Sequence, residues 1–111
     1  MLKIRNFGDL EEGDIVWRED RKEWRIIPIK VIKVGEALSN HVRIYLEGGP
    51  DFLVRLDSYY YDLMYMWSDK EKMISNMKER ATRLESIYIN KIDELISQYD
   101  NLLRWKKGLE I

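Results

Sequence analysis

Residues 68–107 read SDKEKMISNMKERATRLESIYINKIDELISQYDNLLRWKK, and this stretch decides how the chain is organised. It opens with Ser68-Asp69-Lys70-Glu71, the pattern of a helix capping box. Gly108 follows it as a helix stop signal, just after lysines that suit the negative end of a helix. Because neither Gly nor Pro interrupts the stretch, it predicts one continuous helix of roughly 60 Å.

Apolar residues recur along this stretch at spacings of three and four, which places them on one helix face. The positions are Ile74, Met77, Ala81, Leu84, Tyr88, Ile92, Leu95, Tyr99 and Leu102. The spacing is that of a coiled-coil heptad with one stutter between Leu84 and Ile92. We expect the positions before the stutter to rest on the preceding domain. The residues that we expect to mediate dimerisation are Leu84, Tyr88, Ile92, Leu95, Tyr99 and Leu102.

The preceding domain is too small to cover this face. A domain of under 70 residues has a diameter of about 25 Å, less than half the length of the helix. The helix therefore either pairs with a second chain or folds back near Asp100-Asn101. The uninterrupted sequence favours a homodimer.

Residues 1–67 predict a small antiparallel β-barrel. Gly13-Asp14 leads into a first apolar strand, and a turn at Asp20-Arg21 would place Trp17 opposite Trp24. In the next strand, residues 24–34, the apolar alternation changes phase at Val31, which predicts a bulge. Pro28 in this strand predicts an unpaired edge or a bend.

Two further segments complete the predicted barrel. A hairpin turn centred on Gly49 would pair Arg43 with Arg55 on the outer face. Residues 59–67 are rich in aromatic side chains and predict a closing strand, with a helix starting at Ser58 as the alternative. The expected fold class is α+β, a small SH3-like antiparallel β-barrel (residues 1–67) followed by a long C-terminal amphipathic helix of coiled-coil type (residues 68–111).

Charge and cysteine content narrow the classes of function. Residues 1–58 carry ten basic and eleven acidic side chains, and residues 59–111 carry nine of each, so neither half has the basic excess typical of nucleic-acid binders. The chain has no cysteine and therefore no thiolate metal site or cysteine nucleophile. No stretch is apolar enough to suggest a membrane span. We expect a soluble, cytoplasmic protein that does not bind membranes.

One patch on the predicted barrel suggests a ligand. Arg43 and Arg55, if opposed, would repel each other unless an anion lay between them, and Tyr45 would add a ring for stacking. Trp17 and Trp24 would join this patch if they faced outward. The alternative is that nearby acids, such as Asp57 or Glu47, neutralise both arginines.

The sequence carries no recognisable catalytic or metal-binding set. His41 is the only histidine, and the acidic pairs are scattered as on a solvated surface. The aromatic run over residues 59–67 would form either a stacking platform or an ordinary strand with one face in the core. We expect no enzyme activity, no catalytic residues, no metal and no cofactor.

The layout resembles a loose class of small phage-encoded accessory proteins. The resemblance rests on three segments, which are Gly13-Asp14-Ile15-Val16, the aromatic residues 61–67 and the helix start at residues 68–71. The resemblance implies a phage or mobile-element protein that inhibits or modulates a host protein, such as a defence complex, in the host cytoplasm. The first hypothesis is therefore a non-enzymatic, homodimeric module that binds an unidentified protein partner. The alternatives are a nucleic-acid or nucleotide binder and a structural assembly protein.

Overall fold

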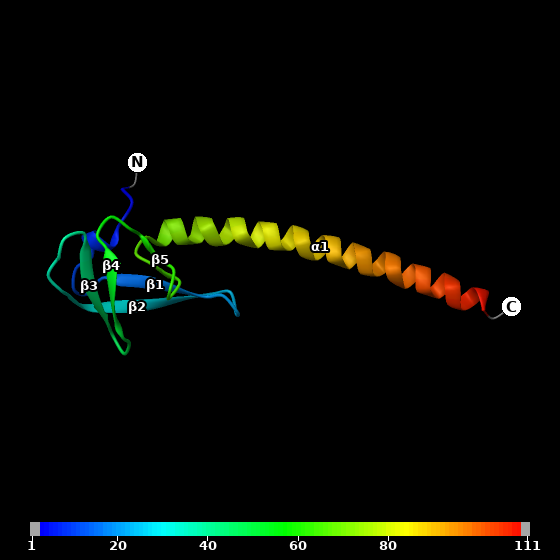
Figure 1. The fold of residues 1–111 in the computed structure, drawn as a ribbon, viewed down its shortest axis with the longest axis horizontal. Helices are drawn as coiled ribbons and strands as arrows, with labels where there is room; N and C mark the ends of the chain where they lie inside the picture. The colour runs from blue at the N-terminus through cyan, green and yellow to red at the C-terminus, as the bar shows by residue number, and fades with distance from the viewer. Residues whose placement is uncertain (1–2, 110–111) are drawn as a thin grey trace. The chain divides into compact units, whose positions relative to one another are not determined.

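The computed structural model describes residues 3–109. It contains a nearly closed six-stranded antiparallel barrel and one long helix (Figure 1). The predicted fold class, a small antiparallel barrel followed by a long amphipathic helix, is confirmed. The outer ends of the two predicted domains, residues 1–2 and 110–111, lie outside the described residues.

The elements follow one another with short connections. A 3-10 helix, η1 (Phe7–Asp9), precedes strands β1 (Ile15–Asp20), β2 (Arg25–Val34), β3 (His41–Leu46), β4 (Asp51–Arg55), β5 (Tyr60–Tyr61) and β6 (Met66–Trp67), and the final element is helix α1 (Lys70–Gly108). The strand order is β4-β3-β2-β1-β6-β5, and every neighbouring pair is antiparallel.

The barrel is filled by apolar side chains that alternate along its strands. Its buried core consists of Phe7, Leu10, Val16, Val31, Val42, Ile44, Leu46, Phe52, Val54 and Met66. The ring of Phe52 on β4 stacks on Tyr61 of β5 with their centroids 5.3 Å apart. This contact joins the first and last strands of the sheet order, so the sheet is nearly closed on itself.

The first hairpin differs from the prediction in register. Asp20 stands opposite Arg25 and Trp17 opposite Pro28, so Trp17 does not face Trp24. The connection is four residues long, 21–24, because the Asp20 carboxylate accepts hydrogen bonds from two backbone amides of the turn at 3.1 and 3.2 Å. This side-chain cap stabilises a wider turn than the predicted two-residue one.

The second hairpin is also displaced, by two residues. Its connection spans residues 47–50, so Arg43 stands opposite Leu53 and Arg55 opposite His41. The predicted opposition of the two arginines is therefore wrong. The predicted bulge is confirmed, because the pairing of β2 with β3 shifts register immediately after Val31.

The aromatic segment is neither the single strand nor the helix that the sequence predicted. It forms a short hairpin, in which β5 and β6 flank a turn containing Tyr65 at a φ of 51°. Strand β6 then pairs with β1, which places Trp67 opposite Trp17.

Helix α1 is continuous over 39 residues and ends at Gly108, as predicted. The alternative of a fold-back near Asp100 is wrong. The helix is capped by Asp69 and not by Ser68: the Lys72 amide donates to Asp69 Oδ1 at 2.9 Å, whereas the Ser68 hydroxyl donates to the Arg5 carbonyl at 2.6 Å. The chain divides into two compact units within this helix, Met1–Ser75 and Asn76–Ile111.

Candidate functional site

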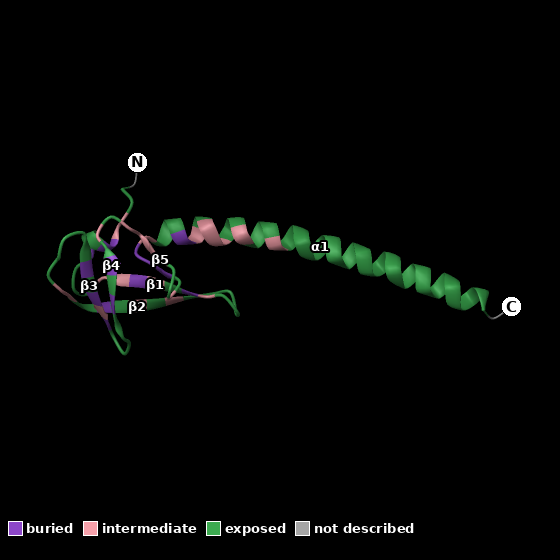
Figure 2. Ribbon diagram, in the orientation of Figure 1, coloured by how far each residue is buried: buried purple, intermediate pink, exposed green. Residues whose placement is uncertain are grey.

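The most prominent candidate surface is the apolar face of α1, which we call the helix stripe. It comprises the predicted dimerisation positions Leu84, Tyr88, Ile92, Leu95, Tyr99 and Leu102, flanked by Ile87, Ile96, Leu103 and Trp105. Leu84 is half-buried, and each of the other residues is at least 44% exposed. Residues 85–109 are all exposed, and Figure 2 shows the distal part of the helix in the colour of exposed residues.

The helix stripe is wider than a simple coiled-coil seam. At 100° per residue, the six predicted dimerisation positions fall within about 80° of one another around the helix axis. Ile96 and Leu103 extend the stripe on one side, and Ile87 and Trp105 extend it on the other, to about 180° in total. An apolar face of this width is typical of a helix that packs against other helices.

Exposure of this face has a physical cost. An isolated helix gains little stability from its backbone, and most helices in proteins are stabilised by packing of their apolar face. Large contiguous apolar patches on a protein surface usually mark an interaction site. Among the described residues of the second unit, nothing covers the stripe, so we identify it as the candidate protein-binding surface.

The predicted patch on the barrel is arranged differently from the expectation. Arg43 Nη1 lies 2.6 Å from Asp51 Oδ2. The hydrogen bond from Arg43 and its positive charge lower the pKa of Asp51, and the same hydrogen bond and the Asp51 charge raise the pKa of Arg43. Arg55 pairs with Asp57 through contacts of 3.2 and 3.3 Å. Both guanidinium groups therefore have carboxylate partners on the barrel itself.

The other patch residues do not join the arginines in one cluster. Tyr45 is half-buried, and the Lys33 ammonium lies 5.3 Å from the centre of its ring. Trp17 is half-buried beside Trp67, whereas Trp24 lies in the first turn with a φ of 54° and is 43% exposed. The two tryptophans are not the facing pair that the sequence predicted.

A buried carboxylate near these tryptophans was missed by the sequence reasoning. The indole nitrogen of Trp67 donates to Glu19 Oε2 at 2.7 Å, and Glu19 is only 2% exposed. The guanidinium of Arg21 lies 3.8 Å from the other Glu19 oxygen and 4.0 Å from the centre of the Tyr65 ring. No sequence signal marked Glu19, because its partner Trp67 lies 48 residues away on β6.

This carboxylate is part of the fold and not of an open site. Every buried side-chain polar atom among the described residues has a hydrogen-bond partner. The Glu19 carboxylate contacts the Trp67 indole and the Arg21 guanidinium and is buried, so it is not exposed to a substrate. The cluster instead ties β1 to β6.

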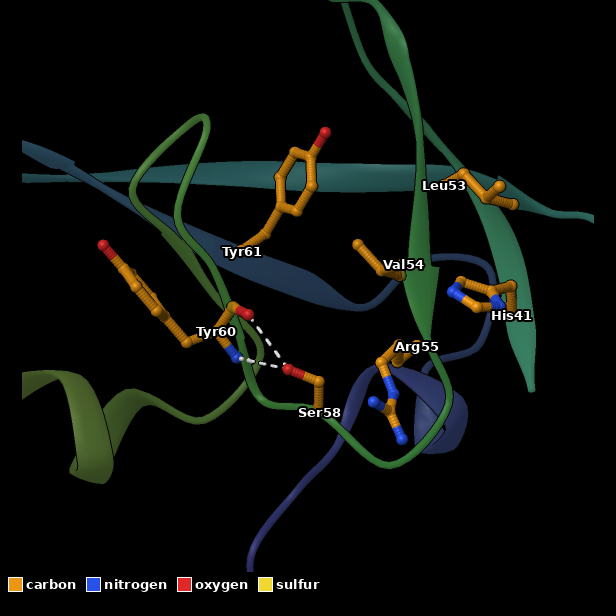
Figure 3. Close-up of a pocket in the computed structure, with 7 residues that line it drawn as sticks. All are labelled: His41, Leu53, Val54, Arg55, Ser58, Tyr60 and Tyr61. Atoms are coloured by element: carbon orange, nitrogen blue, oxygen red, sulfur yellow. Dashed lines mark hydrogen bonds between the residues drawn. The ribbon is translucent and has the colours of Figure 1, made fainter.

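A small pocket lies between β4 and β5. Its lining residues are His41, Leu53, Val54, Arg55, Ser58, Tyr60 and Tyr61 (Figure 3). The hydroxyl of Ser58 bonds to the backbone of Tyr60 and so fixes the start of β5. The volume of about 190 Å³ is below the 300–1,000 Å³ typical of ligand pockets, so a nucleotide would not be enclosed here.

Other classes of site are not found in the described part of the chain. Residues 3–109 contain no group of three or more His, Asp or Glu side chains placed to hold a metal ion. Within the same residues, no helix has both the length and the apolar character to cross a membrane. Comparison with known proteins gives no match to a family model, a curated protein or a solved structure.

Proposed function

We propose that this protein is a non-enzymatic protein-binding module that self-associates through the helix stripe. The observation that carries the proposal is the exposure of Tyr88, Ile92, Leu95, Tyr99 and Leu102 along one face of a continuous helix. Burial of such side chains against a partner is a principal source of binding energy, at about 25 cal/mol per Å² of apolar surface.

The wider role that we propose follows from the order of the elements. A compact barrel followed by an oligomerising helix suits a protein that occupies the surface of a partner without reacting with it. We infer a phage or mobile-element accessory protein of this kind, acting in the cytoplasm on a host protein. The support for this role is the layout of the chain.

Binding of a nucleic acid or nucleotide has less support. Arg43 and Arg55 are already paired with Asp51 and Asp57, and the pocket beside Arg55 is small. Nucleic-acid binding driven by phosphate contacts weakens steeply with salt, whereas apolar helix packing does not. A salt titration of any binding activity therefore distinguishes the two functions.

Sedimentation equilibrium over a range of concentrations tests the proposed self-association. The wild-type protein is expected to sediment above its monomer mass, and Leu95→Asp with Leu102→Asp is expected to sediment as a monomer. The matched control, Asn90→Asp with Ser97→Asp, adds the same charge to the opposite helix face and should leave the mass unchanged. A wild-type protein that stays monomeric at every concentration would refute the proposal.

A further inference from the structure

The charges beside the helix stripe are unevenly distributed along α1. Residues 84–100 contain four acidic side chains and one basic one, whereas residues 101–108 contain three basic side chains and no acidic one. At 100° per residue, Lys106 projects from the middle of the apolar face and Glu85 from its border. A lysine within an apolar seam is a known means of specifying the register of paired helices, and ion pairs beside the seam specify their orientation.

A parallel, in-register pair of helices would place like charges next to each other. Each residue would then face its own copy, so two Lys106 ammonium groups would meet inside the seam and the acidic segments would lie side by side. The aligned helix dipoles of a parallel pair would add to the repulsion. Like charges at facing positions destabilise helix pairs.

An antiparallel pair centred on Ser97 brings apolar residues of the two copies level with one another and places Lys106 near Glu85. In this alignment residue i of one copy lies level with residue 194 − i of the other, so Ile92 lies level with Leu102 and Leu95 with Tyr99. Tyr88 lies level with Lys106, whose alkyl chain can cover the ring while its ammonium group reaches Glu85 one turn away.

We propose that α1 pairs with α1 of a second copy in this antiparallel register, which two Glu85–Lys106 ion pairs specify. The inference rests on the proposed self-association and adds its geometry. It assigns the occupant of the helix stripe as a second copy of this chain, because the apolar residues of two copies, together with Glu85 and Lys106, are complementary in this antiparallel alignment.

A charge-swap experiment tests the ion pairs. Glu85→Lys and Lys106→Glu are each expected to weaken self-association about tenfold, because each places like charges together twice per pair of chains. The double variant, Glu85→Lys with Lys106→Glu, restores opposite charges and is expected to recover the wild-type dissociation constant to within about threefold. A double variant weaker than either single one would overturn the proposal.

Distance measurements between spin labels test the orientation itself. The chain has no cysteine, so Ser97→Cys and Ser86→Cys each give one labelling site per copy. In the antiparallel register the two Ser97 residues are level, whereas the two Ser86 residues are 22 residues or about 33 Å apart along the axis. We therefore expect a clearly longer distance for the Ser86 label.

The outcomes separate this proposal from the one on which it rests. Distances of equal length at both positions would mean a parallel pair, which overturns the antiparallel register but leaves self-association in place. A sample that shows no distance and sediments as a monomer would overturn both.

Discussion

The barrel and the distal part of α1 use the same kinds of side chain in opposite ways. Ile44 in the barrel is completely buried, whereas Ile92 on the helix is 54% exposed. The barrel satisfies its apolar residues within one chain, through alternating strands and the stacked rings of Phe52 and Tyr61. The helix stripe has the periodicity of a packed helix without a partner in its own unit. The two regions therefore differ in where their apolar side chains lie, and under the proposed self-association the helix stripe is buried only when a second copy binds.

The largest effect is expected from a cavity in the barrel. Ile44→Ala removes a fully buried side chain and should lower the free energy of unfolding by about 3 kcal/mol, as measured by urea denaturation followed by tryptophan fluorescence. Leu95→Ala should change the stability of the barrel by less than about 0.5 kcal/mol but weaken self-association. Similar losses of barrel stability in both variants would contradict the contrast between the two regions.

A smaller effect is expected at the buried carboxylate. Glu19→Ala leaves the indole nitrogen of Trp67 buried without this acceptor, which should destabilise the barrel by about 2 kcal/mol. Glu19→Gln retains an acceptor oxygen and should cost less. Equal thermal midpoints for the wild type and Glu19→Ala would show that this hydrogen bond does not hold β1 to β6.

The Asp69 cap of helix α1 should contribute about 1 kcal/mol to the free energy of unfolding, and Asp69→Ala should remove this contribution. Although burial opposes it, hydrogen bonds from the amides of Arg5, Lys72 and Glu71 lower the pKa of Asp69 in the folded protein. The folded state therefore binds this proton less tightly than the unfolded state, and the stabilisation is present at neutral pH and lost as the pH falls below about 4. The gap between wild type and Asp69→Ala in urea titrations should accordingly close below that pH; a constant gap would contradict this role.

The smallest effect is expected on the outer face of the barrel. Arg43→Gln with Arg55→Gln removes two exposed ion pairs, which are screened by solvent and salt, so the urea midpoint should not change measurably. Self-association should also be unaffected. Loss of a salt-sensitive nucleic-acid affinity in this variant would instead support the alternative function.

The features that the sequence predicted well are those governed by local periodicity. The spacing of Ile74 through Leu102 predicted the continuous helix and its apolar face, and the phase change at Val31 predicted the bulge. These signals depend on residues close together in the chain, where 3.6-residue and two-residue repeats are distinct. The order of a barrel followed by a helix followed from the same signals.

The features that the sequence did not predict depend on turn geometry and long-range partners. Both hairpin registers were displaced because the observed connections, residues 21–24 and 47–50, have other centres than the predicted turns at Asp20-Arg21 and Gly49, and every cross-strand pair then changed. The predicted pairing of Arg43 with Arg55 depended on the predicted register, which is not the observed one. The sequence predicted Ser68 as the helix cap. Its hydroxyl instead donates to the Arg5 carbonyl, 63 residues away in the chain, and no local pattern predicts such a contact.

Hydrogen–deuterium exchange at two protein concentrations tests the central claim most directly. If the helix stripe packs against a second copy, the amides of residues 86–103 should exchange more slowly at high concentration, while those of the barrel strands should exchange at the same rate at both. Exchange of residues 86–103 that is fast and independent of concentration would contradict self-association through α1.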